Sequence, residues 1–421
     1  MATSAAVRQV DQYKSLLLER AWAFPARNGY CVMSRVVVVT PLFPLSGQPY
    51  SGRSIYETTR ALQRYADVRV LCPIAVYPFW STLLDRRFRS RLDPTCAPPG
   101  QEVTSVPYPA VPLVSRPFNG EVCARRLYPY LENLHPDVVL SYWLYPEGFA
   151  ACKAGHALGL PVIVGARGSD IRLIPGPVTR RRVSQTLREA DYTLTVSDEL
   201  CSRAIRLGAR PARSKSILNG CDHDIFRPSD RRAAREALGI TAADRVVLYV
   251  GRFARSKGLM ELVAAFSALA KDIPDLKLVC VGSGLLQSVL ETQLKDRVRI
   301  TGNQSLLEVA RWMVAADLFC LPSYSEGCPN VVIEAISCGC PVVATDVGGI
   351  PELVNPDCAI LVPPKDVDRL TDALRSNLSR SWDRDAIGTM FRRTWDQVAR
   401  ETYEVCERVR ESGPRAHSAE S

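Results

Sequence analysis

The sequence predicts an α/β protein with two Rossmann-like domains, each built on a parallel sheet with helices on both faces. The main observation is that short apolar runs alternate with longer helical patterns, which is typical of parallel sheets. The length supports it, because 421 residues correspond to two or three domains at roughly 100 to 200 residues each. The alternation also stops after residue 222 and restarts at residue 245. We expect the active site in the cleft between the domains.

Continuously apolar runs mark the expected strands, since a parallel strand is buried on both faces. The first domain opens on residues 35–40, whose valines favour a strand. Later runs of the first domain are 68–71, 138–141, 162–165 and 193–196. The second domain opens on residues 245–251. Its later strands are expected at 277–281, 298–301, 318–322 and 341–345.

These patterns divide the chain into six segments. Residues 1–33 show no entry into a fold, and Met33 stands just before the first strand, so we expect either a dispensable and disordered extension or a misassigned start. The C-terminal helical pattern has apolar anchors along its whole length, and we expect one long helix that packs across both domains. The other segments are the first domain at 34–225, a linker region at 226–243, the second domain at 244–382, the helix at 383–411 and a tail at 412–421.

Composition narrows the function classes. Apolar residues make up 47% of the chain and charged residues 23%, close to the soluble globular average. The chain has no apolar stretch near the roughly 20 residues of a membrane span, and its start lacks the features of a secretory signal. We therefore expect a cytoplasmic protein. The 14 cysteines are scattered, which favours reduced core thiols, and the four histidines lack zinc spacing. We expect no metal site.

Positive charge is concentrated in the first domain. Residues 34–222 contain 24 Lys and Arg against 15 Asp and Glu, whereas residues 223–421 contain 25 against 27. The excess predicts an anionic partner for the first domain. No nucleic-acid-binding module is recognisable, so we expect no nucleic acid.

A basic and apolar segment at residues 79–92 suggests where that partner binds. Its aromatic and leucine residues stand beside Arg86, Arg87, Arg89 and Arg91. This mixture suits an interfacial helix on anionic lipid at the inner face of the cytoplasmic membrane. An ordinary basic surface helix explains the same pattern.

The most informative segment is 323–335, which follows an expected strand, turns at Gly327 and has Pro329 where a helix would begin. A helix N-terminus presents free amide groups and a partial positive charge, which hold phosphate or sugar oxygens. Glu326 and Glu334 would be about 12 Å apart along the chain, which suits one carboxylate on a sugar and one on a ribose. A loop glutamate and a solvated helix glutamate remain the alternative. The residues expected at the ligand are Glu326, Gly327, Cys328, Pro329, Asn330, Val331 and Glu334.

This segment resembles the E-x7-E signature of the retaining glycosyltransferases of family 4, which have the GT-B fold. The resemblance covers roughly residues 35–410 and is most specific in the second domain. Residues 166–171 resemble the branch of the family associated with cell-envelope polysaccharides such as teichuronic acid. The other matching segments, in family order, are 219–228, 250–259, 281–284 and 347–352.

The resemblance implies a role for each donor-site residue. Arg252 and Lys257, with Gly251 beside them, would hold the donor diphosphate. Glu326 would contact the donor sugar and Glu334 the ribose hydroxyls. Backbone groups of residues 302–307, starting at Gly302, would lie near the base. It also implies retention of anomeric configuration, with the leaving phosphate accepting the acceptor's proton. The nucleotide sugar would be a substrate, and neither a cofactor nor a metal would be required.

Acceptor or phosphate-loop residues are expected in the first domain. Gly47 and Gly52 stand in the loop after the first strand, which in the family closes around phosphates and acceptor; a plain glycine turn is the alternative. Ser141 occupies the position where many relatives have a histidine, so the usual sugar-contacting residue has no counterpart. The other candidates are Glu147, Arg167 and Asp170, and a structural turn explains the last two equally well.

These observations predict a retaining hexosyltransferase that moves a sugar from a UDP- or GDP-linked donor to a lipid-linked or polysaccharide precursor. Two alternatives stay open. A catalytically silent scaffold of the same fold would explain the absent histidine, whereas the presence of Lys257 and Glu326 favours activity. A nucleotide-sugar epimerase would need no acceptor.

Overall fold

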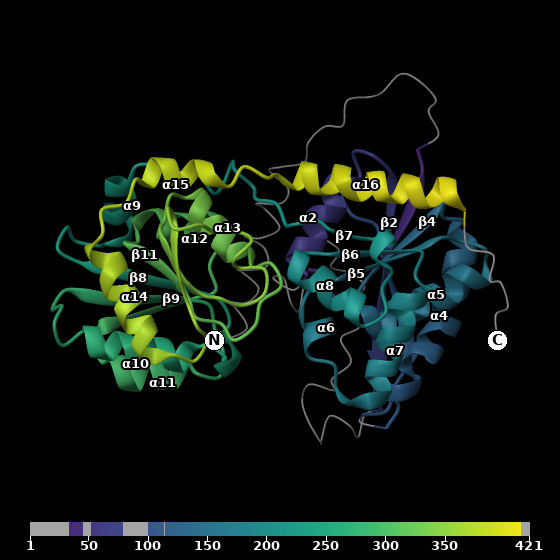
Figure 1. The fold of residues 1–421 in the computed structure, drawn as a ribbon, viewed down its shortest axis with the longest axis horizontal. Helices are drawn as coiled ribbons and strands as arrows, with labels where there is room; N and C mark the ends of the chain where they lie inside the picture. Colours follow the sequence, from purple (N-terminus) through teal and green to yellow (C-terminus); the bar gives the residue numbers. More distant parts are fainter. Residues whose placement is uncertain (1–32, 45–51, 79–99, 113, 414–421) are drawn as a thin grey trace, which may run out of the picture. The chain divides into compact units, whose positions relative to one another are not determined.

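A computed structural model describes residues 33–44, 52–78, 100–112 and 114–413. The chain divides into two compact units, each described by itself below (Figure 1). Unit 1 comprises the described residues up to Leu218 and from Trp395 onward, and unit 2 comprises Asn219–Thr394. The first boundary therefore lies before the expected residue 225, and the chain returns to unit 1 near its end.

Unit 1 contains a parallel seven-stranded sheet within its described residues. The strand order is β3-β2-β1-β4-β5-β6-β7. The order changes direction between β1 and β4, which is where doubly wound folds place their ligands. The strands are β1 (Arg35–Val39), β2 (Asp67–Val76), β3 (Val103–Pro109), β4 (Val138–Tyr142), β5 (Val162–Ala166), β6 (Tyr192–Thr195) and β7 (Ser214–Ser216).

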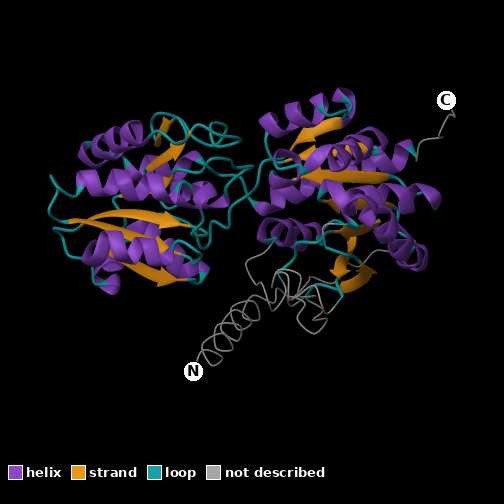
Figure 2. Cartoon of the chain, turned by 90° about the horizontal axis from the view of Figure 1, so that it is seen from below, coloured by secondary structure: helices purple, strands orange, loops and turns teal. Residues whose placement is uncertain are grey.

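Helices cover both faces of this sheet, as Figure 2 shows by the strands lying between them. Crossover helices on both faces are what consecutive parallel strands require. The long helices are α2 (Arg53–Leu62), α4 (Asn119–Leu134), α5 (Phe149–Ala157), α7 (Gly176–Glu189), α8 (Asp198–Arg206) and α16 (Trp395–Ser412). The short ones are η2 (Arg116–Phe118), η3 (Leu144–Gly148), α6 (Ser169–Arg172) and η4 (Pro211–Arg213).

The C-terminal helix α16 completes the core of unit 1. It lies beside α2 (Figure 1), and both helices share one apolar cluster with the strands. Trp395, Val398, Val405 and Val409 are its main buried contributions. A residue near the end of the chain is therefore as much a part of this core as the valines of β1.

Unit 2 contains a six-stranded parallel sheet in the order β10-β9-β8-β11-β12-β13. Two Rossmann-like units confirm the predicted fold class. The strands are β8 (Arg245–Val250), β9 (Leu276–Val281), β10 (Val298–Gly302), β11 (Leu318–Leu321), β12 (Val342–Thr345) and β13 (Ala359–Val362). The helices are α9 (Arg231–Leu238), η5 (Arg255–Lys257), α10 (Leu259–Leu269), α11 (Gln287–Leu294), η6 (Lys295–Arg297), α12 (Leu306–Ala315), α13 (Asn330–Ser337), α14 (Val367–Ser379) and α15 (Arg384–Met390).

Residues 226–243 are part of unit 2 and not a linker. They contain α9, which Asp230 caps by accepting a hydrogen bond from the Ala233 amide. Arg235 of α9 is buried and donates to the carbonyl oxygens of Ala315, Thr241 and Asp244. These bonds attach α9 to the end of α12 and to the loop before β8, which the polar composition of the segment did not indicate.

The expected single helix at 383–411 is wrong, because residues 391–394 separate α15 from α16. The Cys221 amide donates to the Arg393 carbonyl at 2.9 Å, and Cys221 and Thr394 form an isolated parallel bridge. This pairing requires extended backbone at 391–394 and ends the helix. Accordingly α15 belongs to unit 2 and α16 to unit 1.

The described residues bear on two further expectations, that the cysteines are core thiols and that no segment spans a membrane. The described cysteines are buried apart from Cys201, and burial raises the pKa of Cys280 and Cys406 to about 12. Within the described ranges, no helix is both long and apolar enough to span a bilayer. The expected interfacial helix at 79–92 lies outside the described residues, as does nearly all of the extension at 1–33.

The position of α16 generates a stability prediction. Val405 is buried in the apolar cluster, whereas its neighbour Glu404 is exposed. Val405→Ala should lower the free energy of unfolding of unit 1 by about 2 kcal/mol, because it leaves a cavity in the core. Glu404→Ala should change it by less than about 0.5 kcal/mol. Urea unfolding followed by circular dichroism measures both, and equal effects would contradict the assignment of α16 to the core.

Candidate functional site

The candidate donor site lies at the carboxyl edge of the unit 2 sheet. All its strands run parallel, and β11 pairs directly with β8, so the loops that follow these two strands emerge side by side. The loop after β8 spans residues 251–258, and the loop after β11 spans residues 322–329. Ligands of doubly wound sheets bind at this edge, and both loops contain residues that the sequence selected.

Lys257 and Glu326 form the central contact of the site. Lys257 ends the short helix η5, and its Nζ lies 2.6 Å from Oε1 of Glu326. Such a short distance is typical of a charge-assisted hydrogen bond. The two side chains remain 23% and 11% exposed, so the pair is largely shielded but still reachable by a ligand. The structure thus joins two residues that lie 69 positions apart.

Backbone contacts set the two loops against each other. The Tyr324 amide donates to the Ser256 carbonyl at 3.0 Å. Gly258 has a φ of +67°, and a Cβ atom there would lie 1.8 Å from the carbonyl oxygen of Pro322. Only glycine permits both this backbone conformation and this close approach. The separation of Lys257 from Glu326 follows from these contacts.

Tyr324 and Glu261 are site residues that the sequence reasoning missed. The Tyr324 hydroxyl donates to Oε1 of Glu261 at 2.6 Å, and Glu261 lies in the first turn of α10. Burial, and then the hydrogen bond to Glu261, raises the pKa of Tyr324 to about 12. The position of Tyr324 two residues before Glu326 was the available signal, whereas nothing in the pattern indicated Glu261.

Helix α13 follows the second loop and begins one residue later than expected. Pro329 occupies the N-cap, so the helix begins at Asn330. Nδ2 of Asn219 donates to the Cys328 carbonyl at 3.0 Å and to Oδ1 of Asn330 at 2.8 Å. Glu334 is only 3% exposed, so the alternative of a solvated helix glutamate is wrong. Asn219, noted in the sequence only as a family match, positions the start of this helix.

Glycine contacts also connect the loops after β8, β9 and β10. The Gly251 amide donates to Val281, and the Gly282 amide donates to Gly302 at 2.8 Å. Arg252 is exposed and has no ion pair with the residues that the structure describes. The backbone at Arg252 is fixed, because its carbonyl accepts a hydrogen bond from the buried Tyr249 hydroxyl at 2.8 Å. Its guanidinium is therefore an available cation on a rigid loop.

The candidate acceptor residues are distributed over unit 1. Gly47 lies outside the described residues. Gly52 is the N-cap of α2, and its φ of +68° brings it against Leu42. Ser141 is fully buried in β4, and its Oγ has no hydrogen-bond partner in the described part of the chain. Because Ser141 is buried, it is not exposed on the surface in place of the sugar-contacting histidine of many relatives.

Arg167 and Asp170 form a turn after β5. Oδ1 of Asp170 accepts hydrogen bonds from the amides of Arg167 and Gly168 at 3.0 and 2.8 Å, and the residue is 8% exposed. This geometry matches the structural turn that the sequence left open for Asp170. Arg167 instead lies flat on the Tyr142 ring, with its guanidinium carbon 4.3 Å from the ring centre.

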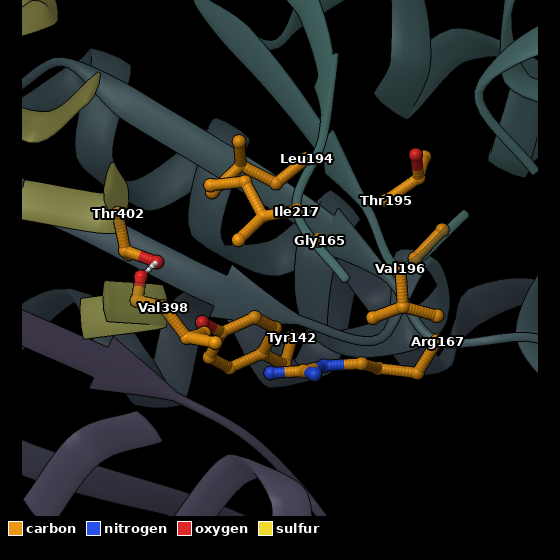
Figure 3. Close-up of a pocket in the computed structure, with 10 residues that line it drawn as sticks. Tyr142, Gly165, Arg167, Leu194, Thr195, Val196, Ile217, Val398 and Thr402 are labelled. Atoms are coloured by element: carbon orange, nitrogen blue, oxygen red, sulfur yellow. Dashed lines mark hydrogen bonds between the residues drawn. The ribbon is translucent and has the colours of Figure 1, made fainter. Parts of the chain in front are cut away.

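A small cavity lies beside Arg167 and Tyr142, between β4–β6 and α16. Figure 3 shows Arg167 extended along Tyr142, with Val398 and Thr402 of α16 opposite Leu194. It leaves room for about one water molecule, about 10 Å³. The cavity is too small to hold a sugar.

Glu147 is a buried acid at the carboxyl end of β4. It lies in η3 and is 4% exposed, and its Oε2 has no hydrogen-bond partner within the described residues. Burial, with a smaller contribution from the charge of Asp170, raises the pKa of Glu147 to about 8. Near neutral pH this side chain is largely a neutral carboxylic acid.

The site residues thus separate into two groups. Unit 2 brings Lys257 and Glu326 into contact, with Gly251 and Arg252 on the same loop as Lys257 and Gly302 at the end of β10. In unit 1, Glu147, Arg167 and Asp170 lie near one another at the ends of β4 and β5, mostly in structural contacts. Within the described ranges, no group of three or more His, Cys, Asp or Glu side chains is arranged to hold a metal ion.

Comparison with known proteins identifies this architecture as that of a glycosyltransferase. The Glycosyltransferase Family 4 model matches residues 51–225, and the model Glycosyl transferases group 1 matches residues 244–380. The chain is 30% identical over 355 residues to the putative teichuronic acid biosynthesis glycosyltransferase TuaC of Bacillus subtilis, covering 81% of this chain and 88% of that protein. The chain therefore belongs to glycosyltransferase family 4, as the signature segment indicated.

A second relative agrees with this assignment, and two solved structures share the fold. D-inositol 3-phosphate glycosyltransferase of Mycobacterium bovis is 37% identical over 260 residues, which are 58% of this chain and 53% of that protein. Sucrose-phosphate synthase of Thermosynechococcus elongatus has a TM-score of 0.70 at 21% identity, covering 90% of this chain and all of that one. Anabaena HepE in complex with UDP and glucose has a TM-score of 0.65 at 20% identity, covering 89% and 99%. The fold is GT-B.

The raised pKa of Glu147 generates a prediction about pH and stability. The folded state keeps this proton up to about pH 8, whereas the unfolded state loses it near pH 4.5. Unit 1 should therefore lose stability as the pH rises through this interval. Glu147→Gln should remove that loss, raising the thermal midpoint at pH 8 and not at pH 4.5. Exposed Glu132→Gln is the control, and equal pH profiles for Glu147→Gln and the unmodified chain would contradict the prediction.

The close approach at Gly258 generates a second prediction. Gly258 and Gly302 have similar φ angles, +67° and +70°, but a Cβ at Gly302 would have no neighbour within 4 Å. Gly302→Ala should cost unit 2 about 1 kcal/mol of unfolding free energy from backbone strain alone. Gly258→Ala should cost about 3 kcal/mol, because it also meets Pro322. Urea unfolding of both variants tests this, and equal losses would show that the loop contact is not required.

Proposed function

We propose that this glycosyltransferase moves a hexose from a UDP- or GDP-linked sugar to a lipid-linked or saccharide precursor of a cell-envelope polysaccharide, with retention of configuration. The observation that supports it most is the Lys257–Glu326 pair at the carboxyl edge of the unit 2 sheet. It provides one cation and one carboxylate, which match the diphosphate and the hydroxyl-rich ring of a nucleotide sugar. Their partial exposure leaves both accessible.

The cations account for departure of the leaving group. A glycosyl transfer breaks the bond between the anomeric carbon and the phosphate oxygen, so negative charge grows on the diphosphate. Lys257 is fixed by the loop contacts, and Arg252 is an available guanidinium on the same loop. Preorganised positive charge at this position lowers the barrier. With that charge supplied by side chains, we propose that the reaction needs neither a metal ion nor a cofactor.

Glu326 is proposed to hold the donor sugar by accepting hydrogen bonds from its hydroxyls. Before donor binding its charge is balanced by Lys257 at 2.6 Å. A diphosphate would draw Lys257 away, and the sugar hydroxyls would replace it at the carboxylate. Glu334, buried in α13, is proposed for the ribose. The acceptor hydroxyl would pass its proton to the departing phosphate, so the reaction requires no side-chain base and proceeds on one face of the sugar.

Related proteins support the choice of substrates. TuaC is named for teichuronic acid biosynthesis, which favours a cell-envelope acceptor. HepE is described with UDP-glucose, which favours a nucleotide-sugar donor for the shared fold. We place the reaction in the cytoplasm, at the inner face of the membrane, because nucleotide sugars are cytoplasmic substrates and a lipid-linked acceptor lies in the bilayer.

Substituting Lys257 and substituting Glu326 should have different effects on nucleotide binding and on sugar transfer. Lys257→Ala should weaken UDP or GDP binding about 10- to 100-fold, because it removes a charged hydrogen bond to phosphate. Glu326→Gln should leave nucleotide binding equal or tighter, because Lys257 is released, while it lowers sugar transfer by about 100-fold or more. Calorimetric titration with UDP, GDP and ADP measures nucleotide binding, and release of nucleoside diphosphate measures sugar transfer.

A control lysine is available in the same unit. Lys277 lies near the start of β9, at the opposite edge of the sheet, and is similarly half-buried. Lys277→Ala should leave both measurements unchanged. Unchanged nucleotide affinity in Lys257→Ala, or full transfer activity in Glu326→Gln, would remove the basis for the proposed donor site. Activity that persists in EDTA would support the metal-free mechanism, and loss of activity in EDTA would contradict it.

A further inference from the structure

Exposed apolar side chains gather on the loops after β3 and β5 of unit 1. Both loops emerge at the carboxyl edge of the sheet, because the strands are parallel. After β3, Val114 and Phe118 are 71% and 62% exposed; after β5, Leu173 and Val178 are 71% and 49% exposed. Large apolar side chains on adjacent loops at one edge mark a contact surface more often than scattered ones do.

These loops lie side by side in the folded unit. The short helix η2, which contains Phe118, packs against α7, which contains Val178. Tyr145 lies beneath them, and its hydroxyl donates to the carbonyl of Arg116 at 2.7 Å. Arg182 of α7 in turn approaches Glu121 of α4, with 3.7 Å between Nη1 and Oε1. The apolar side chains therefore belong to one surface with an ordered base.

The charge of this surface is one-sided. Arg116, Arg180 and Arg181 are exposed, and none forms an ion pair with a described residue. The sequence has no Asp or Glu between residues 103 and 120 or between 171 and 188. Protein surfaces normally intersperse positively and negatively charged side chains. Three available guanidinium groups beside exposed apolar side chains therefore indicate an anionic partner.

We propose that this carboxyl-edge patch, formed by Val114, Arg116, Phe118, Leu173, Val178, Arg180 and Arg181, binds the surface of an anionic lipid bilayer. Apolar side chains on loop tips enter the boundary between headgroups and acyl chains, and arginines pair with lipid phosphates. An acidic protein surface would satisfy the arginines but not the projecting apolar side chains.

The location of the patch agrees with the proposed lipid-linked acceptor, on which the inference partly rests. Leu173 follows α6, which starts two residues after Arg167. The turn of Arg167 and Asp170 is thus contiguous with the patch along the chain. An acceptor held in the bilayer by its lipid would be presented to this same edge of unit 1. The segment expected at the membrane from the sequence, residues 79–92, is not part of the patch.

Vesicle flotation with the full chain tests the proposal. The probes are vesicles of phosphatidylcholine alone and of phosphatidylcholine mixed with phosphatidylglycerol. The unmodified chain should float with the mixed vesicles only, and high salt should release it. The double variant Arg180→Gln/Arg181→Gln should bind about tenfold more weakly or worse, because each arginine near an anionic surface contributes about 1 kcal/mol. Phe118→Ser/Leu173→Ser should lose binding by at least about tenfold.

A matched control uses Leu285 and Leu307 of unit 2, which are 96% and 47% exposed. Leu285→Ser/Leu307→Ser should float like the unmodified chain. Binding that survives both patch variants would overturn the patch and favour another segment such as 79–92. Equal binding to both vesicle types would overturn the role of charge, and no flotation of the unmodified chain would overturn the proposal. Calorimetric nucleotide binding should stay unchanged in every patch variant, which separates this outcome from failure of the proposed donor site.

Discussion

The ion pair between Lys257 and Glu326 is the contact on which the chemistry proposed for unit 2 depends. Neither residue belongs to a long helix or a strand. Loop packing must therefore produce the distance of 2.6 Å between Nζ of Lys257 and Oε1 of Glu326. It results from parallel pairing of β8 with β11, the Tyr324 amide bonded to Ser256, and the contact of Gly258 with Pro322. A pair fixed in this way costs little reorganisation when a charged ligand replaces one partner, which is the property that electrostatic catalysis requires.

Unit 1 depends on a different constraint, the return of the chain after Thr394. Its sheet has the right strand order for a doubly wound fold, but one face would expose Val36, Val138 and Leu140 without α16. The bridge between Cys221 and Thr394 stops the preceding helix and lets α16 begin at Trp395. The extended residues 391–394 are therefore as necessary to unit 1 as any strand, although they belong to unit 2.

Central strands could be predicted from the sequence, whereas of the four edge strands in the described sheets only β10 was predicted. The runs that become β1, β4, β5, β8 and β11 are buried on both faces and read as continuous apolar stretches. The missed strands β3, β7 and β13 all lie at sheet edges, where β3 even contains Pro107 and Pro109. The site divides similarly: the family resemblance identified Lys257 and Glu326, whereas the contacts of Glu261 and Asn219 join distant segments and leave no local pattern.

The two units thus present chemically different edges, although both are carboxyl edges of parallel sheets. In unit 2 the edge combines glycine turns, the exposed Arg252 and Arg255 and a balanced ion pair, and its exposed large apolar side chains are Leu285 and Leu307. In unit 1 the corresponding edge has unpaired arginines and exposed valine, leucine and phenylalanine. The charge count follows the same division, with an excess of nine positive charges in residues 34–222 and a deficit of two in residues 223–421. A small soluble polyanion requires only a few fixed cations, whereas a bilayer requires cations and apolar side chains over an area. Under the proposed function, the same fold serves a soluble donor and a membrane-held acceptor through different loops at equivalent edges.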